Sequence, residues 1–296
     1  MVAITTSHNP QAPTGKQINL FYNTATRNLA LEQRCEGKTH DIPEPIYVGS
    51  GSDQPGHIIN PSHIASATLE GVNLVFGITE QTQQKLNLPA GVQDPGTATQ
   101  NDVSILSPIY RSLISTDQGN TAIAACSSAE VVWIFYLSGV DQCSLMIKEE
   151  ILGDSNPAQY NDTPPILPGS GLAAYYVPES DTRFVIYQSN NSVREFQAHG
   201  SDTSIQYAEA AKKSSLGVVY ANGKAYLYYR NNANDELRKV VKENGVWGSA
   251  QVVTDSRPVD PDSQISVVYA HGYNHVFYST KGTATQIVHV KDFIGY

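Results

Sequence analysis

Two stretches of the chain decide the fold: residues 184–196 read FVIYQSNNSVREF, and residues 226–239 read YLYYRNNANDELRK. Each begins with an apolar run rich in aromatic residues, continues through a polar turn that contains Asn-Asn, and ends in a run that mixes charged and apolar residues. This order is typical of two β-strands joined by a hairpin. The two stretches therefore predict an all-β unit that occurs more than once in the chain.

The apolar run has counterparts along the whole sequence, at residues 19–22 (NLFY), 73–76 (NLVF), 133–136 (WIFY) and 275–278 (HVFY). Five of the six runs follow an opening run of small and β-branched residues, at 64–68, 123–127, 172–176, 216–220 and 265–269. These opening runs begin about 44 to 59 residues apart, which is the spacing of propeller blades. Small residues suit the inner strands, which converge on a narrow axis.

We therefore predict one six-bladed β-propeller domain that spans residues 1–296. The run at 19–22 has no clear opening strand, so residues 1–15 are expected to form a flexible N-terminal segment. A strand from one of the termini is expected to close the ring and protect the blade edges.

Composition and charge exclude several kinds of partner. The net charge is -9, and no run of Lys or Arg occurs, which argues against binding to nucleic acid or to an anionic membrane surface. No apolar stretch approaches the length of about 18 residues needed to span a bilayer. The polar N-terminus lacks the apolar core of a secretory signal, and the three widely spaced cysteines form no recognisable framework, so a cytoplasmic location is expected.

The stretches 184–196 and 226–239, the latter followed by Gly-Val-Trp-Gly at 245–248, resemble blades of the fungal fucose-specific lectins. The resemblance extends over residues 120–293. It implies a six-bladed propeller with sugar sites between adjacent blades. In that family each site uses an Arg of the second strand, a Glu of the third strand and a nearby Trp, which together bind the sugar hydroxyls and its apolar face.

The chain departs from this pattern at the residues that would bind fucose. The position of the lectin Arg is expected at Asn19, Asn73, Trp133, Phe184, Tyr226 and His275. The matching Glu is expected only at Glu195, with Lys239 in the next copy, and the whole chain contains two Trp residues. Loss of these partners predicts weak or absent fucose binding.

The last position of the opening runs carries hydroxyl groups in five copies: Thr68, Ser127, Tyr176, Tyr220 and Tyr269. If these side chains lie at one depth, they form a partial ring at one end of the channel and line an apolar pocket with hydrogen-bond donors. The alternative is that they only cap the core of the propeller.

Two functional hypotheses follow. Some fungal hetero-Diels–Alderases, which join a tropolone quinone methide to a sesquiterpene such as humulene, resemble relatives of these lectins. That resemblance implies a cofactor-free cycloaddition of small apolar substrates, in which the protein holds both partners in reactive contact. The alternative hypothesis is a glycan-binding, fucose-type lectin. The oligomeric state, including a homo-oligomer, stays open.

The candidate site residues serve the first hypothesis. Hydrogen-bond donors to a developing oxyanion would be Tyr176, Tyr220, Tyr269, Arg194 and Arg230. The substrate-binding walls would be Trp133, Trp247, Thr68 and Ser127. No metal is expected, because His271 and His275 fall on a turn and a strand without a third ligand.

Overall fold

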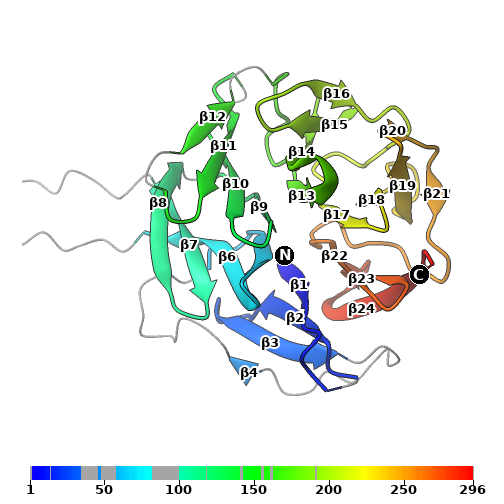
Figure 1. Cartoon of the computed structure of the whole chain (residues 1–296), viewed down its shortest axis with the longest axis horizontal. Helices are drawn as coiled ribbons and strands as arrows, with labels where there is room; N and C mark the ends of the chain where they lie inside the picture. Colours follow the sequence, from blue (N-terminus) through cyan, green and yellow to red (C-terminus); the bar gives the residue numbers. More distant parts are fainter. Residues whose placement is uncertain are drawn as a thin grey trace, which may run out of the picture.

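The computed structural model describes residues 2–13, 15–34, 46–47, 58–81, 100–117, 119–140, 143–154, 157–160, 163–190 and 192–295. Within these residues the strands form six antiparallel sheets around one axis, with β1, β9, β13, β17 and β22 close to its centre (Figure 1). The predicted all-β, six-bladed propeller is confirmed. The helical content of the described residues is a single turn, η1 (Pro178–Ser180), and none of their helices is long and apolar enough to cross a bilayer.

Each blade is a meander whose innermost strand comes first in the sequence. Blade 1 contains β1 (Ile4–His8), β2 (Ile18–Asn23), β3 (Leu29–Arg34) and β4 (Ile46–Tyr47). Blade 2 contains β5 (Ile64–Leu69), β6 (Val72–Glu80), β7 (Gln100–Ser107) and β8 (Arg111–Asp117). Blade 3 contains β9 (Ile123–Ser127), β10 (Val132–Ser138), β11 (Met146–Ile151) and β12 (Ala158–Tyr160). Blade 4 contains β13 (Ala173–Val177), β14 (Thr182–Ser189), β15 (Ser192–Gln197) and β16 (Asp202–Ser204). Blade 5 contains β17 (Leu216–Ala221), β18 (Lys224–Arg230), β19 (Leu237–Glu243), β20 (Val246–Trp247) and β21 (Gln251–Val252). Blade 6 contains β22 (Ser266–Ala270), β23 (Tyr273–Thr280) and β24 (Thr283–Phe293).

The six inner strands touch one another in sequence order, and β22 touches β1, so the ring is closed. They enclose a central cavity of only about 90 Å³. Small side chains permit this approach, as at Gly217, where an added Cβ would lie 3.0 Å from the carbonyl oxygen of Ile265. The predicted reason for small residues in the opening strands, a narrow axis, therefore agrees with the structure.

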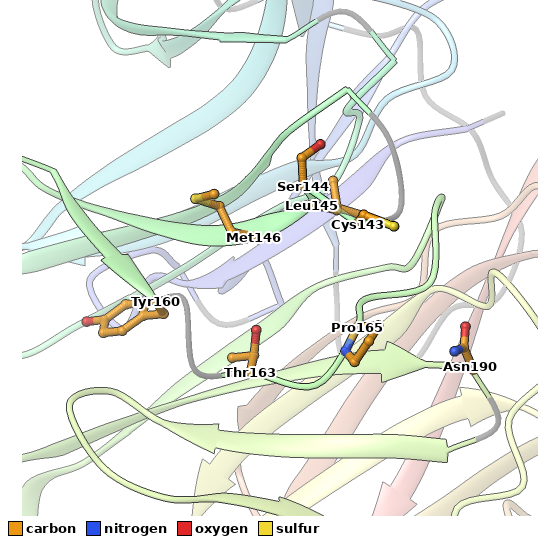
Figure 2. A pocket seen from close by; sticks show the side chains of 8 residues that line it. All are labelled: Cys143, Ser144, Leu145, Met146, Tyr160, Thr163, Pro165 and Asn190. Atoms are coloured by element: carbon orange, nitrogen blue, oxygen red, sulfur yellow. The ribbon is translucent and has the colours of Figure 1, made fainter.

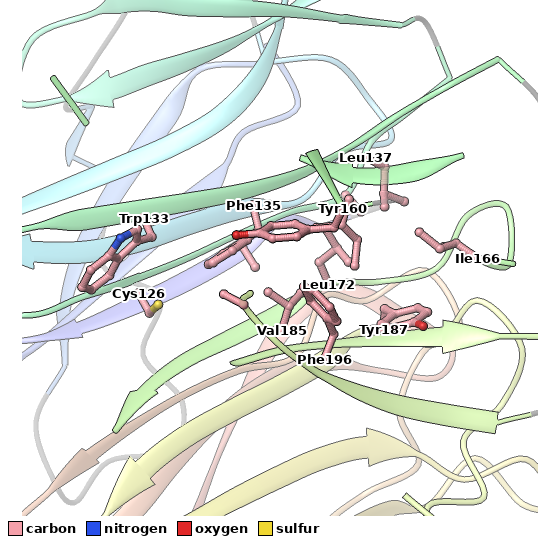
Figure 3. Packing of buried hydrophobic residues seen from close by; sticks show 14 residues of the cluster. Cys126, Trp133, Phe135, Leu137, Tyr160, Ile166, Leu172, Val185, Tyr187 and Phe196 are labelled. Atoms are coloured by element: carbon pink, nitrogen blue, oxygen red, sulfur yellow. The ribbon is translucent and has the colours of Figure 1, made fainter. Parts of the chain in front are cut away.

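The hydrophobic core is divided among the six junctions between consecutive blades. At the junction of blades 3 and 4, Trp133 and Phe135 of β10 pack against Val185 of β14 and Phe196 of β15 (Figure 3). Alternate residues of each strand face the preceding and the following blade, as the two-residue period of a strand requires. A side chain at a given strand position therefore faces the same neighbour, either the preceding or the following blade, in all six blades.

The equivalence of the six second strands holds in five blades and is wrong by one residue in blade 2. Trp133 lies opposite Cys126, the fourth position of its opening strand, whereas the residue opposite the fourth position Ala67 of blade 2 is Leu74 rather than Asn73. The aromatic pattern misled the alignment because blade 2 has Gly77 where blade 3 has an aromatic residue. A Cβ at that glycine would lie 2.7 Å from the side chain of Leu106, so the core has no room there.

The expectation of a flexible segment over residues 1–15 is also wrong. Residues 4–8 form β1, the inner strand of blade 1, and Ile4 is completely buried. Gln264, which directly precedes the inner strand of blade 6, holds this strand in place. Its side-chain oxygen accepts hydrogen bonds from the backbone N–H groups of Ile4 at 2.9 Å and Ile64 at 3.0 Å, and its amide donates to the carbonyl of Ile64 at 2.7 Å. One buried amide thus joins blades 6, 1 and 2.

We predict that Gln264→Leu lowers the free energy of unfolding by at least about 2 kcal/mol, because it leaves three buried backbone groups without their partner. Urea denaturation followed by fluorescence measures the change. The matched control is Gln251→Leu at an exposed position of β21, which should alter stability by less than about 0.5 kcal/mol. Equal stabilities of the two variants would contradict the closure described above.

Candidate functional site between the blades

The tyrosines at the ends of the opening strands lie between blades and do not line the channel. Tyr176 packs in the core of the 3/4 junction, Tyr220 in that of the 4/5 junction and Tyr269 in that of the 5/6 junction. The central cavity is lined by earlier positions of the inner strands, among them Ala124 and Ala173. The hypothesis of a tyrosine ring around an apolar pocket is therefore wrong. The fifth position of each inner strand faces the preceding blade, so successive phenols point into different junctions.

At the 3/4 junction, charged and aromatic residues from both blades meet. Glu149 of β11 is fully buried and accepts a hydrogen bond from the guanidinium group of Arg183 in β14 and another from the hydroxyl of Tyr160 in β12. The guanidinium carbon of Arg183 lies 5.0 Å from the ring centre of Trp133. Tyr176 stacks on the same indole with ring centres 5.3 Å apart.

The 4/5 junction repeats this arrangement with other residues. Lys242 of β19 donates to Glu195 of β15 at 2.6 Å, and the hydroxyl of Tyr175 donates to the same carboxylate. The Lys242 ammonium lies 4.3 Å from the ring centre of Phe184. Tyr220 stacks on Tyr175 with ring centres 6.2 Å apart.

At the 5/6 junction the cation comes from the preceding blade and the carboxylate from the following blade, the reverse of the other two junctions. Lys239 of β19 donates to Asp292 of β24 at 2.6 Å, and the Tyr228 hydroxyl donates to the same carboxylate at 2.6 Å. Asn274 in turn donates to the Tyr228 oxygen at 2.8 Å. Each of these three junctions thus contains a cross-blade ion pair whose carboxylate also accepts a hydrogen bond from a tyrosine.

The register places one member of each ion pair, Glu149, Glu195 or Lys239, at the position expected for the sugar-binding Glu. Glu149 lies opposite Phe135 in blade 3, as Glu195 lies opposite Ile186 in blade 4, so the third-strand Glu occurs in two blades and not only at Glu195. Sequence comparison missed Glu149, although the run of two Glu in β11 was a usable signal. The cation comes from the following blade, from Arg183 at the 3/4 junction and from Lys242 at the 4/5 junction.

The tyrosines of these clusters remain protonated. Burial, together with the neighbouring Glu149, raises the pKa of Tyr160, and burial with Glu195 raises the pKa of Tyr175. Each phenol therefore keeps the proton that it donates to its carboxylate. Each of these carboxylates therefore accepts hydrogen bonds from a cation and from a neutral tyrosine of the protein itself.

The other predicted site residues are separated from these clusters. Arg194 donates to Asp202 within blade 4, and Arg230 donates to Asp235 at 2.5 Å within blade 5. Arg194 lies opposite Tyr187, and Arg230 follows Tyr229, which lies opposite Leu216. Both arginines are therefore near the end of the blade where the opening strand begins, whereas Tyr176 and Tyr220 are near the end where it finishes. The five donors proposed from sequence are therefore not brought together.

The four residues proposed as substrate-binding walls are likewise divided among several junctions. The hydroxyl of Ser127 accepts a hydrogen bond from the backbone N–H of Thr68 at 3.3 Å, at the 2/3 junction. Trp133 belongs to the 3/4 junction and Trp247 to the 4/5 junction, where its ring centre lies 6.0 Å from the Lys242 ammonium. They form no common wall.

Histidines gather in blade 6 without forming a metal centre. Nδ1 of His275 lies 2.8 Å from Nε2 of His289, and burial with the neighbouring His275 lowers the pKa of His289 to about 3. His271 interacts instead with Gln17, at 2.6 Å. Among the described residues, no three His, Cys, Asp or Glu side chains are grouped as metal ligands.

One open pocket of about 400 Å³ lies beside the 3/4 junction (Figure 2). Met146 and Cys143 line one side of it, and Tyr160, Thr163 and Pro165 line the other. The Tyr160 hydroxyl points away from this pocket toward Glu149. The pocket therefore offers few polar groups that converge on a ligand.

Comparison with known proteins supports the fold more strongly than any activity. No protein-family model matches the chain. The chain is 27% identical over 303 residues to the wall-associated proteinases of Coccidioides immitis and Coccidioides posadasii, covering 94% of this chain and 92% of each relative.

Among solved structures, a single-residue variant of the Aleuria aurantia lectin in complex with α-methyl-L-fucoside superimposes with a TM-score of 0.66 at 14% identity, covering 100% of this chain and 96% of the lectin. A triple Arg→Ala variant of AofleA from Arthrobotrys oligospora superimposes with a TM-score of 0.62 at 11% identity, over 100% of this chain and 90% of that protein. At this identity the similarity establishes a fungal-lectin-like six-bladed propeller and no particular ligand.

We predict that Arg183→Met destabilises the protein by about 3–5 kcal/mol, because it leaves the fully buried Glu149 carboxylate without its counter-charge. The double variant Arg183→Met/Glu149→Leu should recover most of this loss. Urea denaturation of the wild type and both variants measures the difference. A single variant as stable as the wild type would contradict the role assigned to this ion pair.

We also predict that L-fucose binds weakly or not at all, because the carboxylates at the sugar positions already bind cations and tyrosine hydroxyls of the protein. Isothermal titration calorimetry with L-fucose and α-methyl-L-fucoside tests this. Saturable binding in the sub-millimolar range would show that the ion pairs open to admit the sugar.

Proposed function

We propose that the chain is a glycan-binding propeller whose ligand contacts lie at the end of blade 4 formed by the β13–β14 hairpin, above the 3/4 and 4/5 junctions. The observation that carries the proposal is that two partly exposed tyrosines, Tyr176 and Tyr220, both donate hydrogen bonds to the β13–β14 hairpin. The hydroxyl of Tyr176 donates to Asp181 at 2.8 Å, and that of Tyr220 donates to Glu179 at 2.9 Å. We call these four residues the blade 4 rim.

The rim combines the groups that sugars require. Its tyrosine rings offer flat apolar faces for the C–H side of a pyranose, and its carboxylates accept hydrogen bonds from hydroxyl groups. The hydrogen bond to Asp181 raises the pKa of Tyr176, and burial followed by the bond to Glu179 raises that of Tyr220. Both phenols are therefore neutral donors, and both carboxylates have lone pairs left for a ligand.

The placement of the rim differs from that of the fucose site in the resembling lectins. In the 3/4 junction the Trp133 indole is already covered by Tyr176 and Arg183, so no sugar ring stacks there. A ligand would lie higher, on the outer side of Tyr176, where His199 is also exposed with 62% of its side chain accessible. An oligosaccharide that spans both tyrosines fits this geometry better than a single fucose.

The two Coccidioides relatives are named wall-associated proteinases, a name that gives both a location and an activity. Association with a wall fits glycan binding, because fungal walls are built of polysaccharide. Proteinase activity is not supported by Cys126, the buried cysteine among the described residues. Burial raises the pKa of the Cys126 thiol far above its ordinary value, so it does not supply a thiolate nucleophile.

The cofactor-free cycloaddition hypothesis has less support than glycan binding. Tyr176 and Tyr220 already donate to carboxylates, and Arg194 and Arg230 are paired with Asp202 and Asp235. The central cavity of about 90 Å³ is far below the roughly 300 Å³ or more of ordinary small-ligand pockets. The lectin-like scaffold itself remains the support for this second hypothesis.

We predict that Tyr176→Ala and Tyr220→Ala each weaken binding of a glycan by about fivefold, since each removes an aromatic face worth about 1 kcal/mol. A glycan array that includes neutral fungal-wall oligosaccharides identifies the ligand, and calorimetry measures its affinity. Tyr207→Ala is the matched control, because Tyr207 is 51% exposed and is not part of the blade 4 rim. Equal losses for all three variants, or no glycan ligand at all, would refute the proposal.

A further inference from the structure

The junction between blades 6 and 1 differs from the other five in its covalent connection. Blades 1 and 6 are the first and the last in sequence, whereas the chain passes directly from one blade to the next at every other junction (Figure 1). Non-covalent contacts hold blades 6 and 1 together, among them a hydrogen bond of 2.8 Å between the hydroxyl groups of Thr6 and Ser266. The ring can therefore open at this junction without stretching a linker.

A histidine occupies the position in this junction that a carboxylate occupies in two others. His289 of β24 lies opposite Phe277, as Glu149 of β11 lies opposite Phe135. At the 3/4 junction the carboxylate at this position pairs with a cation of the following blade. At the 6/1 junction the same position offers a neutral base to blade 1.

Blade 1 still contributes a cation to this junction. Arg34 lies opposite Ile18 in β2, the register position that Lys242 holds opposite Ala225 in blade 5. Arg34 is 6% exposed, and its guanidinium donates to Glu32 of its own strand at 3.1 Å. Because this cation and the histidine occupy the positions of the Lys242–Glu195 ion pair, a proton on the histidine would place two positive charges against each other.

The two histidines of blade 6 form a buried neutral pair. His275 is completely buried, and His289 is 7% exposed. Nδ1 of His275 lies 2.8 Å from Nε2 of His289, and Nε2 of His275 lies 3.3 Å from the carbonyl oxygen of Ala270. The carbonyl accepts the proton of His275, so His289 donates the bond between the rings and both rings are neutral. Phe277 stacks on His289 with ring centres 4.4 Å apart, which leaves little solvent to stabilise a charge.

Acid favours the open state of this junction. Burial, with His275, Lys291 and Arg34 nearby, lowers the pKa of His289 to about 3. In an open junction the exposed ring would titrate near its ordinary pKa of about 6.5. The closed junction is therefore fully stable above about pH 6.5 and loses stability as the pH falls toward 3, because only the open state takes up the proton.

The other titratable groups at this junction modify the effect. Burial raises the pKa of Glu32, so the closed junction binds a proton there more readily than the open one, and Glu32 opposes the histidines. Lys291 is exposed and keeps its charge, with its ammonium 5.5 Å from the ring centre of Tyr273. His8 and His271 pack edge to face, with ring centres 5.8 Å apart.

We propose that the 6/1 junction is an acid-sensitive closure, at which protonation of the His275–His289 pair separates blades 6 and 1 while the other junctions stay packed. The 3/4, 4/5 and 5/6 junctions each hold charges of opposite sign, which attract each other over the same pH range. The inference goes beyond the proposed function, because it concerns the closure of the ring and requires no ligand.

Thiol labelling at pH 7.5 and pH 5.5, read by peptide mass spectrometry, tests the proposal on the full chain. The variant Leu20→Cys places a thiol on the completely buried blade 1 face of the 6/1 junction. The native Cys126 reports on the 3/4 junction, and the exposed Cys143 corrects for the intrinsic reactivity of a thiol at each pH. Ile18→Cys is a second reporter on the same face, should the first variant fail to fold.

One proton taken up on opening raises the opening equilibrium constant about tenfold between these pH values. We expect labelling at the 6/1 reporter to rise by about this factor relative to Cys143, while Cys126 stays protected. An equal rise at Cys126 would indicate global unfolding and overturn the proposal. Unchanged labelling of the reporter at pH 5.5 would overturn it too.

The double variant His275→Gln/His289→Gln, made in the reporter background, identifies the groups that take up the proton. It should abolish the acid-dependent rise or reverse it, since Glu32 alone favours closure on acidification. The matched control is His199→Gln, which removes an exposed histidine of blade 4 and should leave the tenfold rise intact. A rise that survives the double variant would assign the effect to another buried histidine, such as His63, and refute the proposal.

Discussion

The close approach of the six inner strands is the constraint on which the rest of the structure depends. Small side chains such as Gly217 let the strands converge until the central cavity is only about 90 Å³. Such a narrow axis leaves no room for a ligand of any size, so the large side chains and the chemistry are displaced outward into the junctions between blades. Gln264 secures this arrangement where the ends of the ring meet, by binding the backbones of two other blades.

Because the axis is closed, the charged groups of the blades lie in the junctions and pair there with each other. Three successive junctions contain a cross-blade ion pair, and a tyrosine donates to the carboxylate of each. A buried carboxylate needs a counter-charge, and in each of these junctions the neighbouring blade supplies the cation. The junctions are thereby fixed, and the surfaces left for a ligand lie above them or at their far ends.

Much of the fold could be predicted from the sequence, because the repeated aromatic run and the spacing of the opening strands both derive from blade packing. The details that failed depend on tertiary contacts. Gly77 displaced the aromatic pattern of blade 2 by one residue because Leu106 fills the space beside it. The strand at residues 4–8 was missed because its sequence is polar and because its burial depends on tertiary neighbours, among them Ser66 of blade 2 and Gln264 beside blade 6.

The candidate site was less predictable, since its pairs form between blades. Nothing local to Arg183 indicates that it reaches Glu149, which is 34 residues distant. Strand parity, by contrast, could have placed Tyr176 and Tyr220 in separate junctions without a structure.

The most direct test of glycan binding at blade 4 is a crystal structure of the chain with the best oligosaccharide from an array. The account predicts sugar rings against Tyr176 and Tyr220, within hydrogen-bond distance of Asp181 or Glu179. An oligosaccharide bound away from all four residues would contradict it.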